Sequence, residues 1–318
     1  MQVRNALRAL AFSLPIITLA PLCAQEGSTP PPRIGSLTSG VGAPGLAPEA
    51  DLEYVCPMDA DIRSKAPGVC PRCGMKLVRG IAETSEYPVR ITTQPVRLHA
   101  GRDVRLDFRV QDPKTLTPVR DFEIVHEKLY HLFVISQDLQ FFVHEHPQLR
   151  PDGSFQLQLR FPKPGLYRVL NDFYPATGTP QLIERTLLVE GEGFQLAFAR
   201  INADTAPKHT ENLDVELALD PPRPVAGMKT LLFFRLTPKD GIEPLLGAMG
   251  HMLAASSDLI DMIHTHPFQV TDYKDGAAEQ IQFNVIFPRQ GVYRVWVQFQ
   301  RKGVVNTAAF NVPVGQLE

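Results

Sequence analysis

Two stretches of the chain, 131–147 and 251–267, carry the same arrangement of histidines. The first reads HLFVISQDLQFFVHEHP and the second HMLAASSDLIDMIHTHP, so in each a single histidine precedes an HxH pair at the same spacing. Imidazole is the commonest metal ligand among side chains, as well as a general acid and base. Three imidazoles meeting at one point would suit Cu(II), Zn(II) or Ni(II).

An antiparallel hairpin would bring the three histidines of each stretch together. Alternate residues of a strand share a face, so HxH places both rings on one side. If the turn is centred between Asp138 and Leu139, residues whose numbers sum to 277 face each other. Directly opposed Cβ atoms are then about 5 Å apart and diagonal ones roughly 7 to 8 Å apart. The sequence therefore predicts two histidine triads, His131, His144 and His146 in the first stretch and His251, His264 and His266 in the second.

The residues beside the two triads differ. His126 and Glu127 precede the first triad, whereas Met249, Met252 and Met262 surround the second. Thioethers favour Cu(I), so the methionines predict a softer second site beside a harder first one. The alternative interpretation is structural, with the histidines hydrogen-bonded inside the fold or stacked on phenylalanines.

A third candidate site lies in the segment YVCPMDADIRSKAPGVCPRCGMKLV, which contains the cysteines of the mature chain. CPRCG has the spacing of a metal knuckle, in which two thiolates converge on one ion and the glycine lets backbone amides point at sulfur. A tetrahedral site then needs the third cysteine and one more ligand. The alternative is a disulfide with one spare thiol. The ligands that we expect are Cys56, Cys70 and Cys73, with Met58, Asp59, Met75, a histidine elsewhere or an exogenous group as the fourth.

Through the pattern YxCPMx(11)CPxCGMxL, this segment resembles the heavy-metal-binding domain of copper-transporting ATPases and of periplasmic adaptors of copper and silver efflux pumps. The resemblance implies that the three cysteines, with Met58 and Met75 near them, belong to a soft-metal site. That family commonly reads CPMH, whereas Asp59 stands in the fourth position here. The choice between Cu(I) and Zn(II) therefore stays open.

Beyond the cysteine segment the sequence has the pattern of β-strands. Short runs such as VRLDFRV, IQFNVIF and VYRVWVQF alternate apolar and polar residues or are rich in β-branched and aromatic ones. Turn signals such as DPK, PDG and PKPG separate them, and no stretch shows a sustained helical period. Many short strands of this kind predict sandwiches or barrels.

The β portion is an internal repeat. AGRDVRLDFRV at 100–110 aligns with AGMKTLLFFRL at 226–236, and FPKPGLYRV aligns with FPRQGVYRV, both with an offset of 126 residues. The histidine stretches are offset by 120 residues. We therefore predict two homologous β domains, one at 87–191 and one at 195–316.

Tyr167 and Tyr293 follow a glycine at the start of an apolar strand, as in the tyrosine corner of immunoglobulin-like sandwiches. Trp296, on the same strand as Tyr293, is expected in the core. With the histidine stretches, these segments resemble the bacterial YtkA-like family of exported immunoglobulin-like domains, which implies a fold and a metal context but no activity. The predicted fold is mainly β, with a small N-terminal metal-knuckle segment at 51–80 followed by two homologous immunoglobulin-like β-sandwich domains.

The N-terminus has the layout of a secretory signal peptide. Arg4 and Arg8 precede an apolar run that ends in small residues, so we expect cleavage near Ala24 and a mature chain in the periplasm or outside the cell. A lipid anchor at Cys23 is the alternative. Residues 25–50 are rich in Pro, Gly, Ser and Ala and are predicted to form a disordered linker.

Charge and motifs limit the function. Loss of residues 1–24 removes two arginines and no acidic residue, so the formal net charge changes from -2 to -4. This balance argues against nucleic acid as a partner, because binding phosphates would need a strongly basic surface. Neither a Ser/His/Asp order nor a phosphate loop nor a paired carboxylate stands out, and we expect no enzymatic activity.

These observations predict an exported copper or heavy-metal-binding protein for sequestration, delivery or resistance. Its cofactor would be a copper or zinc ion, and its partner a membrane metal transporter or efflux component. The alternative is a cell-envelope protein-interaction module with a structural zinc knuckle. The sequence leaves the oligomeric state open.

Overall fold

The computed structural model is entirely β in the part of the chain that it describes, and no helix long and apolar enough to cross a bilayer occurs there. The predicted signal peptide at 1–24, the linker at 25–50 and Asp59 lie outside that part. The described residues are 52–58, 62–81, 85–176, 178–196, 199–269 and 280–317.

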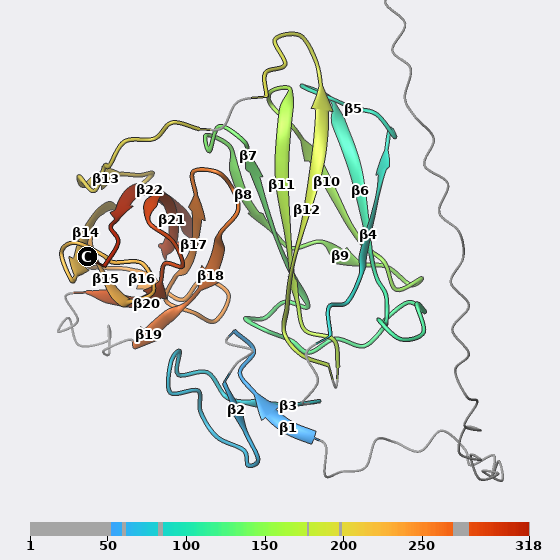
Figure 1. The fold of residues 1–318 in the computed structure, drawn as a ribbon, viewed down its shortest axis with the longest axis horizontal. Helices are drawn as coiled ribbons and strands as arrows, with labels where there is room; N and C mark the ends of the chain where they lie inside the picture. Colours follow the sequence, from blue (N-terminus) through green and yellow to red (C-terminus); the bar gives the residue numbers. More distant parts are fainter. Residues whose placement is uncertain are drawn as a thin grey trace, which may run out of the picture. The chain divides into compact units, whose positions relative to one another are not determined.

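The cysteine segment forms a small antiparallel sheet with the strand order β2-β1-β3 (Figure 1). Its CPRCG turn lies in the loop between β2 and β3, closed by a bridge between Val69 and Lys76. The sheet therefore holds the two halves of the cysteine motif side by side. The strands are β1 Leu52–Val55, β2 Arg63–Ser64 and β3 Val78–Ile81.

The first repeat is a sandwich of two sheets (Figure 1). Strand β6 alternates buried and half-buried residues, and its inward side chains include Phe108, which packs against Tyr130. The ring of Tyr130 in turn packs against Phe155. One sheet has the order β4 Val89–Gln94, β6 Asp103–Val110, β10 Phe155–Arg160 and β9 Gln148–Leu149. The other has the order β5 Leu98–His99, β12 Gln181–Glu190, β11 Gly165–Phe173, β7 Tyr130–Ser136 and β8 Phe142–Glu145.

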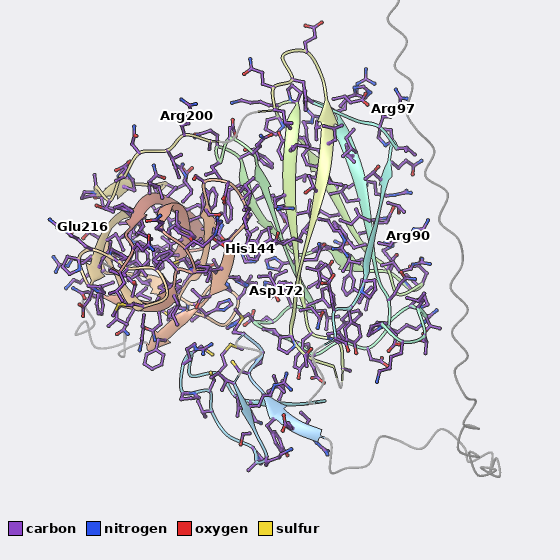
Figure 2. All side chains as sticks on the ribbon, viewed as in Figure 1. Arg90, Arg97, His144, Asp172, Arg200 and Glu216 are labelled. Atoms are coloured by element: carbon purple, nitrogen blue, oxygen red, sulfur yellow. The ribbon has the colours of Figure 1, made fainter. Side chains whose placement is uncertain are left out.

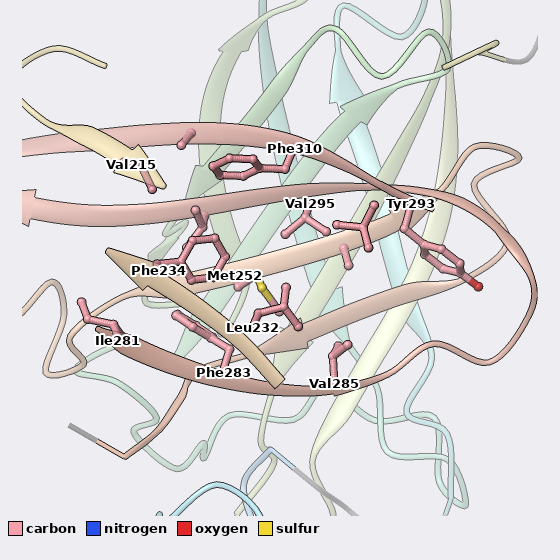
Figure 3. Packing of buried hydrophobic residues seen from close by; sticks show 14 of the residues in the cluster. Val215, Leu232, Phe234, Met252, Ile281, Phe283, Val285, Tyr293, Val295 and Phe310 are labelled. Atoms are coloured by element: carbon pink, nitrogen blue, oxygen red, sulfur yellow. The ribbon is translucent and has the colours of Figure 1, made fainter. Parts of the chain in front are cut away.

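The second repeat has the same architecture. Figure 3 shows Phe234, Phe283 and Phe310 among the apolar side chains that fill its core. One sheet has the order β13 Lys208–His209, β14 Asp214–Asp220, β15 Lys229–Thr237, β20 Ile281–Ile286 and β19 Pro267–Gln269. The other has the order β16 Ile242–Glu243, β21 Gly291–Arg301, β17 His251–Ser256 and β18 Met262–Thr265, and β22 Val304–Val314 also pairs with β21.

Both tyrosine corners are present. The hydroxyl of Tyr167 donates to the carbonyl of Lys163 at 2.8 Å, and that of Tyr293 donates to the carbonyl of Arg289 at 3.1 Å. Each tyrosine is buried at the start of the strand that follows a Gly-containing turn. The comparison of these segments with immunoglobulin-like sandwiches is therefore confirmed.

The predicted hairpin register is confirmed in both repeats. Phe133 pairs with His144 across β7 and β8, and Leu253 pairs with His264 across β17 and β18. The turn residues Leu139 and Leu259 have φ of 58° and 56°, in the left-handed region that leucine rarely adopts. Both leucine side chains are buried, and this burial offsets the cost of their backbone conformation.

A separate apolar cluster joins the two repeats. It combines Leu139 and Leu170 of the first repeat with Leu259 and Trp296 of the second. The ring of Phe142 stacks on Trp296, with centroids 4.9 Å apart and planes 9° from parallel. Trp296 is thus buried as predicted, but between the repeats rather than inside one sandwich.

Because Trp296 is the only tryptophan of the chain, its fluorescence reports on this cluster. We predict that Phe142→Ala, which removes the stacked ring, shifts the emission to the red and lowers the free energy of unfolding by about 1 kcal/mol for the lost ring pair. The matched control is Phe141→Ala, because Phe141 packs on Tyr167 inside the first sandwich. Equal red shifts in both variants would contradict this assignment.

Candidate metal centres

The three cysteines meet at one point. Their sulfur atoms all lie within 4.8 Å of one another, and the sulfurs of Cys56 and Cys73 are 3.3 Å apart. All three are reduced thiols, not joined in disulfides, and all three are buried. The backbone amide of Met58 points at the sulfur of Cys56, and that of Arg72 at the sulfur of Cys70, both at 3.4 Å. This is the knuckle geometry that the spacing predicts.

Without a cation, this thiol cluster resists ionisation. The contact with the Cys56 thiol and burial raise the pKa of Cys73, and burial raises the pKa of Cys70. A bound soft cation reverses this balance, because a coordinating thiol is deprotonated outright. The thioether residues Met58 and Met75 pack against the cysteines, as expected for neighbours of a soft-metal site.

The first triad also converges. The ligand nitrogens of His131, His144 and His146 lie within 4.8 Å of one another. Nδ1 of His131 is 3.2 Å from Nε2 of His144 and 3.1 Å from Nε2 of His146. Two Nε2 atoms and one Nδ1 atom therefore face a common point.

The second triad repeats this donor set. The ligand nitrogens of His251, His264 and His266 lie within 4.8 Å of one another, and all three residues are buried. Nε2 of His266 is 2.8 Å from Nδ1 of His251. Nε2 of His264 is buried without a hydrogen-bond partner among the described residues.

Hydrogen bonds on the far side of the rings decide which nitrogen carries the proton. Nε2 of His131 is 2.9 Å from the carbonyl of Val125, and Nε2 of His251 is 2.8 Å from the carbonyl of Leu245. A carbonyl only accepts, so each Nε2 is the donor. The Nδ1 lone pair of each ring is consequently directed into its triad.

The first histidine of each HxH pair is held by a side chain of the other repeat. Nδ1 of His144 donates to Oε1 of Gln298 at 2.9 Å, and Nδ1 of His264 donates to Oδ2 of Asp172 at 2.5 Å. His144 and Asp172 are labelled in Figure 2. Both donor bonds leave the Nε2 lone pair facing the triad.

Sequence reasoning missed Asp172 and Gln298. They occupy equivalent places in the repeat, because their numbers differ by 126, the offset that aligns GLYRV with GVYRV. That alignment could have paired them with each other. It could not have shown that each reaches a histidine of the opposite repeat, because that depends on how the repeats pack.

Histidine lone pairs face each other in the first triad. Nε2–H of His131 and Nδ1–H of His144 both donate to groups outside the triad. No proton therefore lies between Nδ1 of His131 and Nε2 of His144, which are 3.2 Å apart. Two acceptors in contact repel each other, whereas a cation between them attracts both. The donor set therefore fits a metal ion better than a histidine hydrogen-bond network.

The five residues expected beside the triads lie in different surroundings. His126 stacks on His266 of the second triad, with ring centroids 3.7 Å apart. Met262 packs against the cluster between the repeats. Met252 is buried in the core of the second sandwich, and Met249 packs against that core. Glu127 lies in an exposed turn, where its carboxylate approaches Gly247.

The structure therefore corrects the expectation that Met252 supplies a thioether to the second triad. Alternation along β17 places Met252 on the face opposite His251, so its side chain points into the sandwich. The predicted contrast between a soft second site and a hard first one therefore loses the methionine that was its main support.

The two triads lie close to each other. The ring centroids of His144 and His251 are 5.3 Å apart, and those of His131 and His264 are 6.0 Å apart. Burial lowers the pKa of every triad histidine for which a shift is resolved, and it lowers the pKa of His146 to about 3. Burial therefore favours the neutral form of these histidines, which is the form that binds a metal ion.

Two family models match the chain. The model described as a heavy metal binding domain matches residues 53–79, and the model described as a domain of unknown function (DUF8832) matches twice, at 82–191 and 208–316. The matches agree with a metal-binding segment followed by two copies of one domain. Likeness to the YtkA-like family stays a prediction.

Two of the similar solved structures show the kind of fold that the chain shares. Fibronectin(III)-like modules of CbhA from Clostridium thermocellum have 14% identity over 72% of this chain and 95% of that chain, with a TM-score of 0.20. The Escherichia coli adhesin FdeC has 12% identity over 76% of this chain and 70% of that chain, with a TM-score of 0.23. Neither likeness bears on function. No curated protein matches the chain.

We predict that the metal-free protein loses stability on acidification. Burial lowers the pKa of His126 and His146 from 6.5 to about 3. The unfolded chain takes up these protons near pH 6.5 and the folded chain does not, so stability is complete above pH 6.5 and falls below it. The slope is up to about 1.4 kcal/mol per pH unit for each such histidine.

Urea unfolding of chelator-treated protein between about pH 7.5 and pH 5 measures this slope. His126→Leu, which copies Leu246 at the equivalent place of the second repeat, should make the fall shallower. His209→Gln is the control, because His209 is exposed. The same slope in all three proteins would contradict the prediction.

Proposed function

The chain belongs to the DUF8832 family, whose domain it carries twice behind a heavy metal binding domain, and we propose that it is an exported carrier that sequesters or delivers copper or zinc. It would hold ions at three places, one in the cysteine segment and one at each histidine triad. The other interpretation, an interaction module with a structural zinc knuckle, predicts an ion at the cysteines alone.

The convergence of histidine lone pairs carries this proposal. In both repeats a backbone carbonyl and a side chain of the other repeat accept the outer N–H groups of two of the three histidines. Orienting partners of this kind are typical of metal-bound histidines, because they fix the tautomer and the ring position. A structural cluster would instead use those N–H groups to bond the rings to one another.

The burial of the second triad supports storage or transfer rather than catalysis. His251, His264 and His266 have at most 8% of their surface exposed. Catalytic metal sites keep an open position for water or substrate, whereas closed sites hold their ion. The cysteine cluster is similarly closed, with each cysteine at most 8% exposed.

Two classes of ligand suit a carrier that binds copper both as Cu(I) and as Cu(II). Thiolates and thioethers bind Cu(I), and imidazoles bind Cu(II) and Zn(II). The heavy metal binding domain supports the thiolate site, and the triads add harder sites in the same chain. The partner in this proposal is a membrane metal transporter or efflux component.

Metal content tests the number of sites. Reduced protein loaded with zinc and then desalted should retain up to three ions per chain. His144→Ala combined with His146→Ala should lose one ion, and so should Cys70→Ser, because each change breaks one set of ligands. His209→Gln, an exposed histidine, is the control and should keep all of them.

Two results would overturn the proposal. A wild-type protein that retains no ion after desalting would exclude stable metal binding. Triad variants that hold as much metal as wild type, with one ion lost only in Cys70→Ser, would make the histidines structural and favour the interaction module.

Export is tested by the mass of the mature chain. Expressed with its full N-terminus in a bacterium that has a periplasm, the protein should appear in the periplasmic fraction with its first residue near Gln25. A chain that keeps Arg4 and Arg8 and stays in the cytoplasm would contradict export. A mass that includes a lipid on Cys23 would support the anchored form instead.

A further inference from the structure

We propose that the two triads are unequal, and that the carboxylate of Asp172 makes the second triad the tighter site for a divalent cation. Asp172 would act as a positioning residue, since it binds His264 rather than the ion. Gln298 gives His144 of the first triad a neutral partner in the same place. This inference rests on the proposed function, because it concerns ions bound at the triads.

The two partners are equivalent in position but not in charge. Asp172 on β11 pairs with His131 of its own repeat, and Gln298 on β21 pairs with His251 of its own repeat. Each nevertheless reaches across to the opposite repeat, Asp172 to His264 and Gln298 to His144. The two repeats can therefore be compared directly, because a carboxylate and an amide occupy equivalent positions and each accepts a hydrogen bond from the first histidine of an HxH pair.

The carboxylate contact is the shorter of the two and is largely shielded from solvent. Oδ2 of Asp172 lies 2.5 Å from Nδ1 of His264, whereas Oε1 of Gln298 lies 2.9 Å from Nδ1 of His144. The side chain of Asp172 is 16% exposed and that of His264 is 2% exposed. A charge held this far from solvent acts more strongly on its neighbours than an exposed one.

A carboxylate does two things for the ligand that an amide cannot. It draws the Nδ1 proton toward itself, which increases electron density at Nε2 and strengthens its bond to a cation. It also places a negative charge one ring away from the ion, so a divalent cation is partly neutralised in a buried site. The amide of Gln298 fixes the tautomer of His144 without supplying that charge.

One of the two unsatisfied nitrogen atoms of the second triad, Nε2 of His264, agrees with this assignment. Nε2 of His264 is buried and has no hydrogen-bond partner in the described part of the chain, although its ring is fixed by Asp172. A buried, oriented lone pair without a partner costs free energy unless a ligand meets it. The methionines beside the second triad predicted a softer site there, whereas the carboxylate of Asp172 favours a divalent cation.

Single-triad proteins separate the two affinities. In a Cys70→Ser, Cys73→Ser background, His264→Ala with His266→Ala leaves only the first triad, and His144→Ala with His146→Ala leaves only the second. Competition of each protein with a zinc chelator gives its affinity for Zn²⁺. We expect the second triad to bind about 10- to 100-fold more tightly, the range by which such partners change metal affinity.

Exchange of the two partners tests the cause. Asp172→Asn should remove the advantage of the second triad and leave the first triad within about twofold, and Gln298→Glu should tighten the first triad by a similar factor. A gain of affinity in Gln298→Glu would not arise from damage to the fold. The emission of Trp296 checks that the repeats stay packed in each variant.

The outcomes distinguish the two proposals. If neither single-triad protein binds Zn²⁺, the proposed function fails at the histidines. If both triads bind Zn²⁺ with equal affinity, or if Asp172→Asn weakens both equally, the triads are metal sites. The carboxylate then does not determine which triad binds more tightly. Only a loss confined to the second triad, with a gain in the first from Gln298→Glu, supports the inference.

Discussion

The hydrogen bond from each strand histidine to the carbonyl of the preceding turn determines the chemistry of both triads. In the first repeat, the carbonyl of Val125 accepts from Nε2 of His131 and also from the amide of Lys128, within a turn whose central residues have positive φ. Leu245 and His251 repeat this arrangement. Because an imidazole that donates through one nitrogen offers a lone pair at the other, the turn orients the donor atom before any ion arrives.

Burial has opposite consequences for the two kinds of ligand. It keeps imidazoles neutral and thus ready to bind, as the lowered pKa of His146 shows. It also keeps thiols protonated, because the pKa of Cys70 is raised. Binding at the cysteines therefore has to release protons, whereas binding at the triads displaces none from a histidine that is already neutral. The same enclosed structure makes one site dependent on proton release and the others nearly independent of it.

The parts of this protein that follow from short-range geometry were predictable. The period of two along a strand and the turn at Asp138 gave the register that brings His131 and His144 together, and the spacing of CPRCG gave the thiol cluster. The same period also implies that Met252 faces away from His251, which contradicts its expected place beside the triad. Asp172 and Trp296 could not be assigned, since their contacts depend on packing between repeats that no local pattern encodes.

The contacts between the repeats also bear on how such a protein could arise. If one repeat formed a symmetric dimer, every position would occur twice in the same surroundings, and the two triads would have identical partners. Fusion into a single chain removes that restriction. Asp172 can differ from Gln298, and His126 can differ from Leu246, although each pair occupies equivalent places. Covalent duplication thus allows two sites of common descent to diverge in strength while their geometry is conserved.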